Sequence, residues 1–102
     1  MITSLEPHLL AQWVSTGKEF QLIDVRNSYE FERFNIGGVS IELGELRQRR
    51  HEISIHLPVV FVCFNGSLSQ TAIQLLNLDE VCSNFYNLKG GILGWRAHTT
   101  LG

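Results

Sequence analysis

Charged residues of either sign are scarce in this sequence, and it contains no long hydrophobic run. Eight Lys and Arg residues against ten Asp and Glu residues give a formal net charge of -2 over 102 residues. A chain with this balance lacks the strongly basic surface that binds nucleic acid or an anionic membrane. No apolar stretch approaches the length of a membrane span, and we see no charged and then apolar leader. We therefore expect neither nucleic acid nor a membrane as a partner.

Cysteine is also scarce, and the residues that bind metals are scattered. The two cysteines, without a secretory leader, favour a reducing, cytoplasmic location in which a thiol stays free unless chemistry uses it. The four histidines show no pairing at metal-ligand spacing: His8, His51, His56 and His98. The sequence therefore predicts no metal site, and it contains no sign of an organic cofactor.

The most concentrated charge is the basic run RQRRH at residues 47–51. Glu45 and Glu52 flank this run, so its positive charge is local. We interpret the run as the solvated face of a helix rather than as a binding surface.

The chain shows no repeat, low-complexity tract or linker, which predicts a single domain over residues 1–102. Its elements are expected to alternate between helix and strand. We expect an N-terminal helix capped by Ser4 that buries Leu9, Leu10, Trp13 and Val14 and stops at Gly17. Further helices are expected to open at Ser28, to cover 44–53 and 69–78, and to close the chain from Ile92.

The expected strands are short, apolar and separated by these helices. They are FQLIDVR at 20–26, a short strand after the glycine turn within IGGVSIEL at 36–43, Val59 to Cys63, and NFYNL at 84–88. Alternation of this kind predicts an α/β domain with a mainly parallel sheet. Ligands of such sheets gather at the carboxyl ends of the strands, where Asp24, Arg26 and Cys63 are all expected to lie.

Cys63 is the strongest candidate for chemistry in the chain. A thiol is a good nucleophile only as the thiolate, and its free pKa of about 8.5 leaves it mostly protonated at neutral pH. The start of the helix that follows carries partial positive charge and unpaired N–H groups. A loop over Phe64 to Leu68 can aim its N–H groups at the sulfur, and Gly66 permits the positive φ that such a curl needs.

Both cysteines also have a purely structural interpretation. Free cysteine is among the most buried residue types, so Cys63 could simply finish a core strand. The loop and helix that follow favour a functional role for it. Cys82 lies in an apolar context without such a loop, and we interpret it as packing.

Three segments together resemble the signature segments of rhodanese-like sulfurtransferase domains. These are LIDVRNSYEFERFNIGG, VVFVCFNGSLS and FYNLKGGILGW, which match in order and spacing from about Leu22 to Trp95. The segment NIGGVSIELGELRQRRHEI looks most similar to rhodanese domains fused to enzymes that activate ubiquitin-like sulfur carriers. The resemblance implies a parallel sheet of about five strands with helices on both faces.

The resemblance also implies a mechanism and roles for individual residues. Cys63 would take sulfur from a sulfane donor as a persulfide and pass it to a thiophilic acceptor, for which a sulfur-carrier protein is a candidate. The binding loop would hold that sulfur through backbone N–H groups, and its residues are Phe64, Asn65, Gly66, Ser67, Leu68 and Ser69. Asp24 and Arg26 would brace the site, Glu30 would pair with an arginine, and Ser69 would cap the helix.

The chain departs from the family pattern in the loop itself. Active sulfurtransferases usually carry a basic residue before the final serine and often another after the cysteine, where this chain has Leu68 and Phe64. The guanidinium group of arginine binds an oxyanion such as thiosulfate through two hydrogen bonds. Because the loop lacks such a residue, we expect weak activity with that donor. Ser69 stands where related phosphatases place their phosphate-binding arginine, which argues against phosphatase chemistry.

Three hypotheses follow from these residues. The first is a single-domain sulfurtransferase with Cys63 as the persulfide carrier, and the retention of Cys63 and Gly66 favours it. The second is a catalytically weak interaction or regulatory module, which the missing loop arginines favour. The third is a thiol redox sensor, because an activated thiol is also easily oxidised.

Overall fold

The computed structural model describes residues 2–101 and contains a parallel sheet of five strands. Every neighbouring pair of strands is parallel, in the order β1-β5-β4-β2-β3. The strands are β1 (Thr3–Leu5), β2 (Gln21–Asp24), β3 (Val39–Ser40), β4 (Val59–Val62) and β5 (Phe85–Leu88). The predicted α/β class, with its mainly parallel sheet of about five strands, is confirmed.

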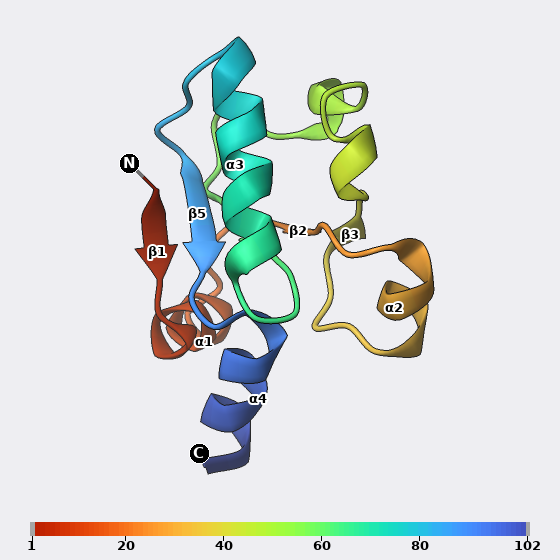
Figure 1. The fold of residues 1–102 in the computed structure, drawn as a ribbon. Helices are drawn as coiled ribbons and strands as arrows, with labels where there is room; N and C mark the ends of the chain where they lie inside the picture. Colours follow the sequence, from red (N-terminus) through yellow and green to blue (C-terminus); the bar gives the residue numbers. More distant parts are fainter. Residues whose placement is uncertain (1, 102) are drawn as a thin grey trace.

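Helices cover both faces of the sheet (Figure 1). Helix α3 (Ser67–Asp79) packs on one face, together with two 3-10 turns, η1 (Leu43–Glu45) and η2 (Arg50–Glu52). Helices α1 (Pro7–Ser15) and α4 (Gly91–Leu101) pack on the other face, and α2 (Ser28–Arg33) follows β2. None of the helices over residues 2–101 is long and apolar enough to cross a membrane.

The central strand β4 is buried on both sides, which explains its continuous apolar sequence. Val59 and Phe61 face the α3 side, and Val60 and Val62 face the side of α1 and α4. Cys63 follows immediately and belongs to the α3-side cluster. Because successive side chains of β4 alternate between the two faces of the sheet, Cys63 lies on the α3 face. It is next to the start of α3, at the carboxyl edge of the sheet.

Two predicted helices differ from the structure. Ser4 lies in β1 and does not cap α1, whose N-cap is Glu6 with Pro7 in the first helical position. Val14 is 59% exposed and does not face the core. The segment 44–53 forms 3-10 turns rather than one helix, because too few apolar side chains recur along it to bury a helical face.

The arginines of the basic run are engaged by acceptors within the chain. Arg47 pairs with Asp79 at the end of α3, and Arg49 pairs with Glu45 and Glu52. Hydrogen bonding from Arg47 lowers the pKa of the Asp79 carboxyl, and hydrogen bonding from Arg49 lowers that of Glu52. Arg50 donates to the backbone oxygens of Leu76 and Glu80. The run therefore ties residues 47–52 to α3 and offers little free positive charge.

Candidate functional site

The sulfur of Cys63 lies where backbone donors converge on it. The residue is 1% exposed and directly follows β4. Its Sγ atom accepts hydrogen bonds from the backbone N–H groups of Gly66, at 3.1 Å, and Ser69, at 3.3 Å. Both groups belong to the loop and first turn of α3, whose N-terminal end carries partial positive charge. This arrangement stabilises an anionic sulfur without a basic side chain.

The loop is shorter than the sequence predicted. Gly66, with φ of +95°, is the N-cap residue, and α3 begins at Ser67 rather than at Ser69. The side chain of Asn65 accepts hydrogen bonds from the N–H and hydroxyl of Ser67 and so closes the turn. Ser69 therefore does not cap the helix. It lies in the first turn, where its N–H points at Cys63.

The first residues of α4 form hydrogen bonds with the backbone of the Cys63 loop. Ile92 N–H donates to the Cys63 carbonyl at 2.9 Å, and Leu93 N–H donates to the Phe64 carbonyl at 3.0 Å. Gly91, with φ of +57°, lies so close that a Cβ atom there would be 2.4 Å from the Cys63 carbonyl oxygen. The GG pair of the third segment thus allows two stretches of backbone to touch beside the site.

Asn87 on β5 is a buried polar residue that belongs to none of the predicted site residues. Its Oδ1 atom accepts a hydrogen bond from the Ser69 hydroxyl, and its Nδ2 donates to the Gly66 carbonyl at 3.1 Å. The Ser69 Oγ atom is also 3.3 Å from Cys63 Sγ. The only signal in the sequence was a polar residue at an inward position of the apolar stretch NFYNL.

We expect replacement of Asn87 with leucine to destabilise the protein and to slow the alkylation of Cys63. The change leaves the Ser69 hydroxyl and the Gly66 carbonyl buried without their partner, which costs about 1–3 kcal/mol. Urea unfolding measures the first effect, and the rate of reaction with iodoacetamide measures the second. Ser69→Ala combined with Asn87→Leu should cost less than the sum of the two single changes. Additive losses would show that the two side chains do not act together.

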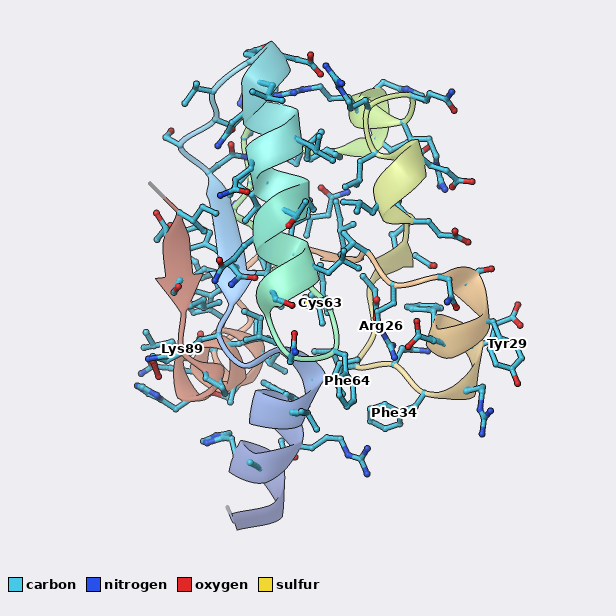
Figure 2. All side chains as sticks on the ribbon, in the orientation of Figure 1. Arg26, Tyr29, Phe34, Cys63, Phe64 and Lys89 are labelled. Carbon is cyan, nitrogen blue, oxygen red and sulfur yellow. The ribbon has the colours of Figure 1, made fainter. Side chains whose placement is uncertain are left out.

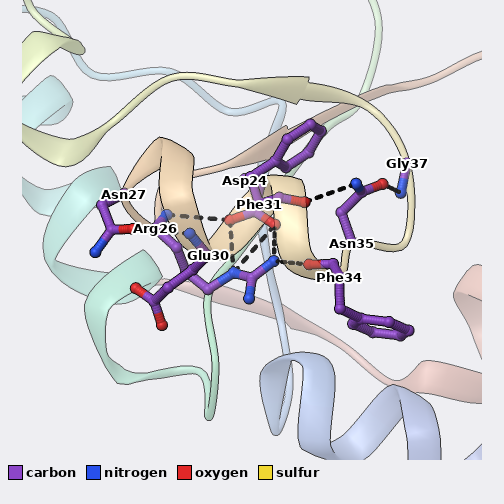
Figure 3. A network of polar contacts seen from close by, with 8 residues as sticks. All are labelled: Asp24, Arg26, Asn27, Glu30, Phe31, Phe34, Asn35 and Gly37. Carbon is purple, nitrogen blue, oxygen red and sulfur yellow. Dashed lines mark hydrogen bonds and ion pairs between the residues drawn. The ribbon is translucent and has the colours of Figure 1, made fainter.

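Asp24 and Arg26 form a buried pair at the end of β2 (Figure 3). Arg26 donates through Nε and Nη2 to the Asp24 carboxylate, with Nη2 at 2.9 Å from Oδ2. The same Nη2 donates to the Phe34 carbonyl at 2.6 Å and thereby fixes the end of α2. Within residues 2–101, Glu30 forms no ion pair, and its N–H is accepted by the Asn27 side chain. The predicted role of Glu30 as an arginine's partner therefore has no counterpart in this geometry.

Two hollows flank the Cys63 loop. One, of about 370 Å³, is polar and includes Asn65, Ser67, Asn87 and Lys89. The other, of about 440 Å³, brings Arg26, Glu30 and Phe64 together with residues of α2 and α4. Phe64 is 50% exposed and Leu68 is 38% exposed, so the loop presents apolar groups to solvent, as its sequence indicates.

The remaining thiol and the metal-binding residue types lie outside this arrangement. Cys82 packs against the α3-side core, as predicted, and Arg50 Nη2 donates to its sulfur at 3.1 Å. In the part of the chain that the structure describes, no three His, Cys, Asp or Glu side chains gather as ligands for a metal ion. The arrangement at Cys63 suits nucleophilic attack by a thiolate and storage of an anionic sulfur species.

Comparison with known proteins gives consistent matches in sequence. The family model described as rhodanese-like domain matches residues 6–98. The uncharacterized protein YqhL of Bacillus subtilis is 43% identical over 79 residues, which are 76% of this chain and 62% of YqhL. YrkF of the same organism is 27% identical over 89 residues, 86% of this chain and 48% of YrkF. The thiosulfate sulfurtransferase GlpE of Coxiella burnetii is 26% identical over 92 residues, which are 89% of this chain and 85% of GlpE. The chain thus spans about half to two thirds of the length of the two Bacillus proteins.

Solved structures match the fold over almost the whole chain. A rhodanese-like domain protein from Staphylococcus aureus superposes with a TM-score of 0.82 at 20% identity, covering 92% of this chain and 91% of that one. Reduced CoADR-RHD from Bacillus anthracis superposes with a TM-score of 0.81 at 25% identity, covering 98% of this chain and 17% of that one. At the lower of these identities the likeness concerns the fold alone.

Proposed function

The chain belongs to the rhodanese-like domain family, and on that basis we propose that it is a sulfurtransferase that carries sulfur as a persulfide on Cys63. The observation that carries the proposal is the pair of backbone N–H groups, from Gly66 and Ser69, directed at the cysteine sulfur. Such preorganised donors favour the negative charge of both the thiolate and the persulfide. The relative named as a thiosulfate sulfurtransferase supports the same class of reaction.

The proposed reaction has two steps, each a displacement at sulfur. The Cys63 thiolate attacks the outer sulfur of a donor R–S–SH, so that the donor's S–S bond breaks and R–S⁻ leaves. Cys63 then carries the S–SH group. An acceptor thiolate attacks the outer sulfur in turn, forms its own persulfide and returns the Cys63 thiolate. Atoms, electrons and charge balance in both steps, and no oxidant is needed.

The apolar loop favours persulfide donors over thiosulfate. Thiosulfate carries two negative charges next to the sulfur that is transferred, and a guanidinium group would bind it through two hydrogen bonds. Phe64 and Leu68 supply no charge at the loop positions where the family usually has basic residues. We therefore expect loading by cysteine persulfide to be at least about tenfold faster than loading by thiosulfate, a difference of about 1.4 kcal/mol in activation free energy.

Intact-mass spectrometry after incubation with cysteine persulfide or thiosulfate tests the proposal. The protein is expected to gain one sulfur atom from cysteine persulfide and to lose it on addition of cyanide or excess thiol. Cys63→Ala should abolish the gain, whereas Cys82→Ala should retain it and serves as the matched thiol control. Failure of both donors to load Cys63 would remove the enzyme hypothesis. It would favour a rhodanese-like binding module, the alternative that the missing loop cations support.

A further inference from the structure

Exposed aromatic rings gather beside the Cys63 loop. Tyr29 is 64% exposed, Phe34 is 45% exposed and Phe64 is 50% exposed, and all three line the same hollow. Figure 2 shows Phe64 and Phe34 next to each other below Cys63, with Tyr29 further out on α2. Single exposed apolar side chains are ordinary on a protein surface, but a group of aromatic rings in one groove marks an interaction site.

Two arginines from different helices add positive charge to this groove. Arg33 of α2 lies over the Tyr29 ring at 5.6 Å, and Arg96 of α4 lies over the Phe34 ring at 5.1 Å. Within residues 2–101 neither forms an ion pair with a carboxylate, unlike Arg26, which is neutralised by Asp24. Glu30 is the one acidic residue among those that line the groove. The groove therefore has an excess of positive charge in a chain whose formal net charge is -2.

We infer that this α2–α4 groove, formed by Tyr29, Arg33, Phe34, Phe64 and Arg96, docks an acidic and apolar segment of the partner protein that exchanges sulfur with Cys63. The inference rests on the proposed function and specifies its partner. Aromatic residues and arginine are the residue types enriched at protein interfaces and at their energetic centres. The cation–π contact of each guanidinium with its ring, at 5.6 Å for Arg33 and 5.1 Å for Arg96, restricts the arginine side chain, so its N–H groups can bind carboxylates with a smaller loss of side-chain freedom.

The burial of Cys63 favours a narrow protein segment over a broad protein surface. The cysteine is 1% exposed, so a flat surface resting on the rim would not reach its sulfur. A thiol in an extended or flexible segment can enter while its acidic and apolar neighbours contact the groove. A small donor could not contact all three exposed rings of the groove, so the rings favour a longer protein segment as the ligand.

Three synthetic peptides of equal length, each with one cysteine converted to a persulfide, test this inference. One peptide places Asp and Leu around the cysteine, the second places Ser and Leu there, and the third places Lys and Leu there. The initial rate at which each loads Cys63 is measured by intact mass. Wild-type protein is expected to load fastest from the acidic peptide. Arg33→Gln and Arg96→Gln should each lower that rate about threefold, and the double variant roughly tenfold.

The chain offers matched controls for both kinds of change. Lys18 lies over Trp13 in a cation–π pair outside the groove. Lys18→Gln therefore removes a cation of the same kind and should leave the rate of loading from the acidic peptide unchanged. Phe34→Ala should lower loading from all three peptides, whereas Val81→Ala removes another exposed apolar side chain, 79% exposed, and should have no effect. Loading from the small persulfide of 2-mercaptoethanol, which has no carboxylate or ammonium group, should be the same in every variant.

The outcomes separate this inference from the proposed function. If 2-mercaptoethanol persulfide, cysteine persulfide and thiosulfate all fail to load wild-type Cys63, the proposed function fails and the inference fails with it. If 2-mercaptoethanol persulfide loads Cys63 normally but the three peptides react equally, the inference is wrong and the function stands. Glutathione persulfide provides the third comparison. If its rate depends on the arginines as the acidic peptide's rate does, but not on Phe34, the groove selects small carboxylates and the protein partner is excluded.

Discussion

Replacement of Asp24 with alanine is expected to lower the free energy of unfolding by about 3–5 kcal/mol, because Arg26 would remain buried without its counter-charge. The side chains of the pair are 8% and 1% exposed, so water cannot replace the lost carboxylate. The carboxylate also accepts the backbone N–H of Arg26 at 3.0 Å, which would lose its partner as well. Urea unfolding followed by circular dichroism measures the change.

A double replacement separates the buried charge from the space that the pair fills. Asp24→Leu together with Arg26→Met removes both charges and fills much of the volume of the pair with apolar side chains. It should recover part of the lost stability, because the Arg26 N–H and the Phe34 carbonyl still lack their partners. Arg26→Lys keeps the charge but cannot reproduce the fork to Asp24 and the bond to the Phe34 carbonyl. We expect it to be less stable than the wild type. A loss under about 1 kcal/mol for Asp24→Ala would mean that the pair is solvated and contributes as a surface pair does.

Much of this architecture could be predicted from local patterns in the sequence. The apolar run at 59–62 predicts a fully buried strand, and the glycine at 66 predicts a position of positive φ. The structure contains both. Both depend on the residues themselves and their immediate neighbours. Parallel topology then brings the ends of β2 and β4 to one edge, which is why Asp24, Arg26 and Cys63 could be assigned to one region.

Other features depend on contacts between residues that are distant in the sequence. β1 is a three-residue edge strand whose pairing with β5 has no local signature, so Ser4 looked like a helix cap. Asn87 is explained only by Ser69 and Gly66, which α3 brings across from another segment. Arg33 and Arg96 are 63 positions apart in number, and only the packing of α2 and α4 beside the loop places both in one groove. The sequence correctly indicated that the Cys63 loop has no basic residue. It could not indicate that Arg33 and Arg96, from α2 and α4, lie in the groove beside this loop.

Replacement of Gly91 with alanine is expected to damage both the stability of the fold and the geometry of the site. The new Cβ atom would lie 2.4 Å from the Cys63 carbonyl oxygen and 2.7 Å from the Phe64 carbonyl carbon, so the backbone must move. Left-handed strain of about 1–2 kcal/mol and overpacking of about 1–3 kcal/mol together predict a loss of roughly 2–5 kcal/mol. Displacement of the Cys63 and Phe64 backbone would change the position of the Cys63 sulfur relative to the N–H groups of Gly66 and Ser69, and a displacement of about 1 Å can slow a reaction about a hundredfold.

Gly17→Ala is the matched control for this prediction, because it separates strain from collision. Gly17 also has a positive φ, of +73°, but a Cβ atom there meets nothing within 4 Å. Its replacement should cost only the strain, about 1–2 kcal/mol, and should leave the rate of Cys63 loading in folded protein unchanged. Unfolding in urea and loading with cysteine persulfide, both measured where each variant is folded, distinguish the two. Equal effects of the two replacements would mean that the contact between α4 and the Cys63 loop is not what positions the sulfur.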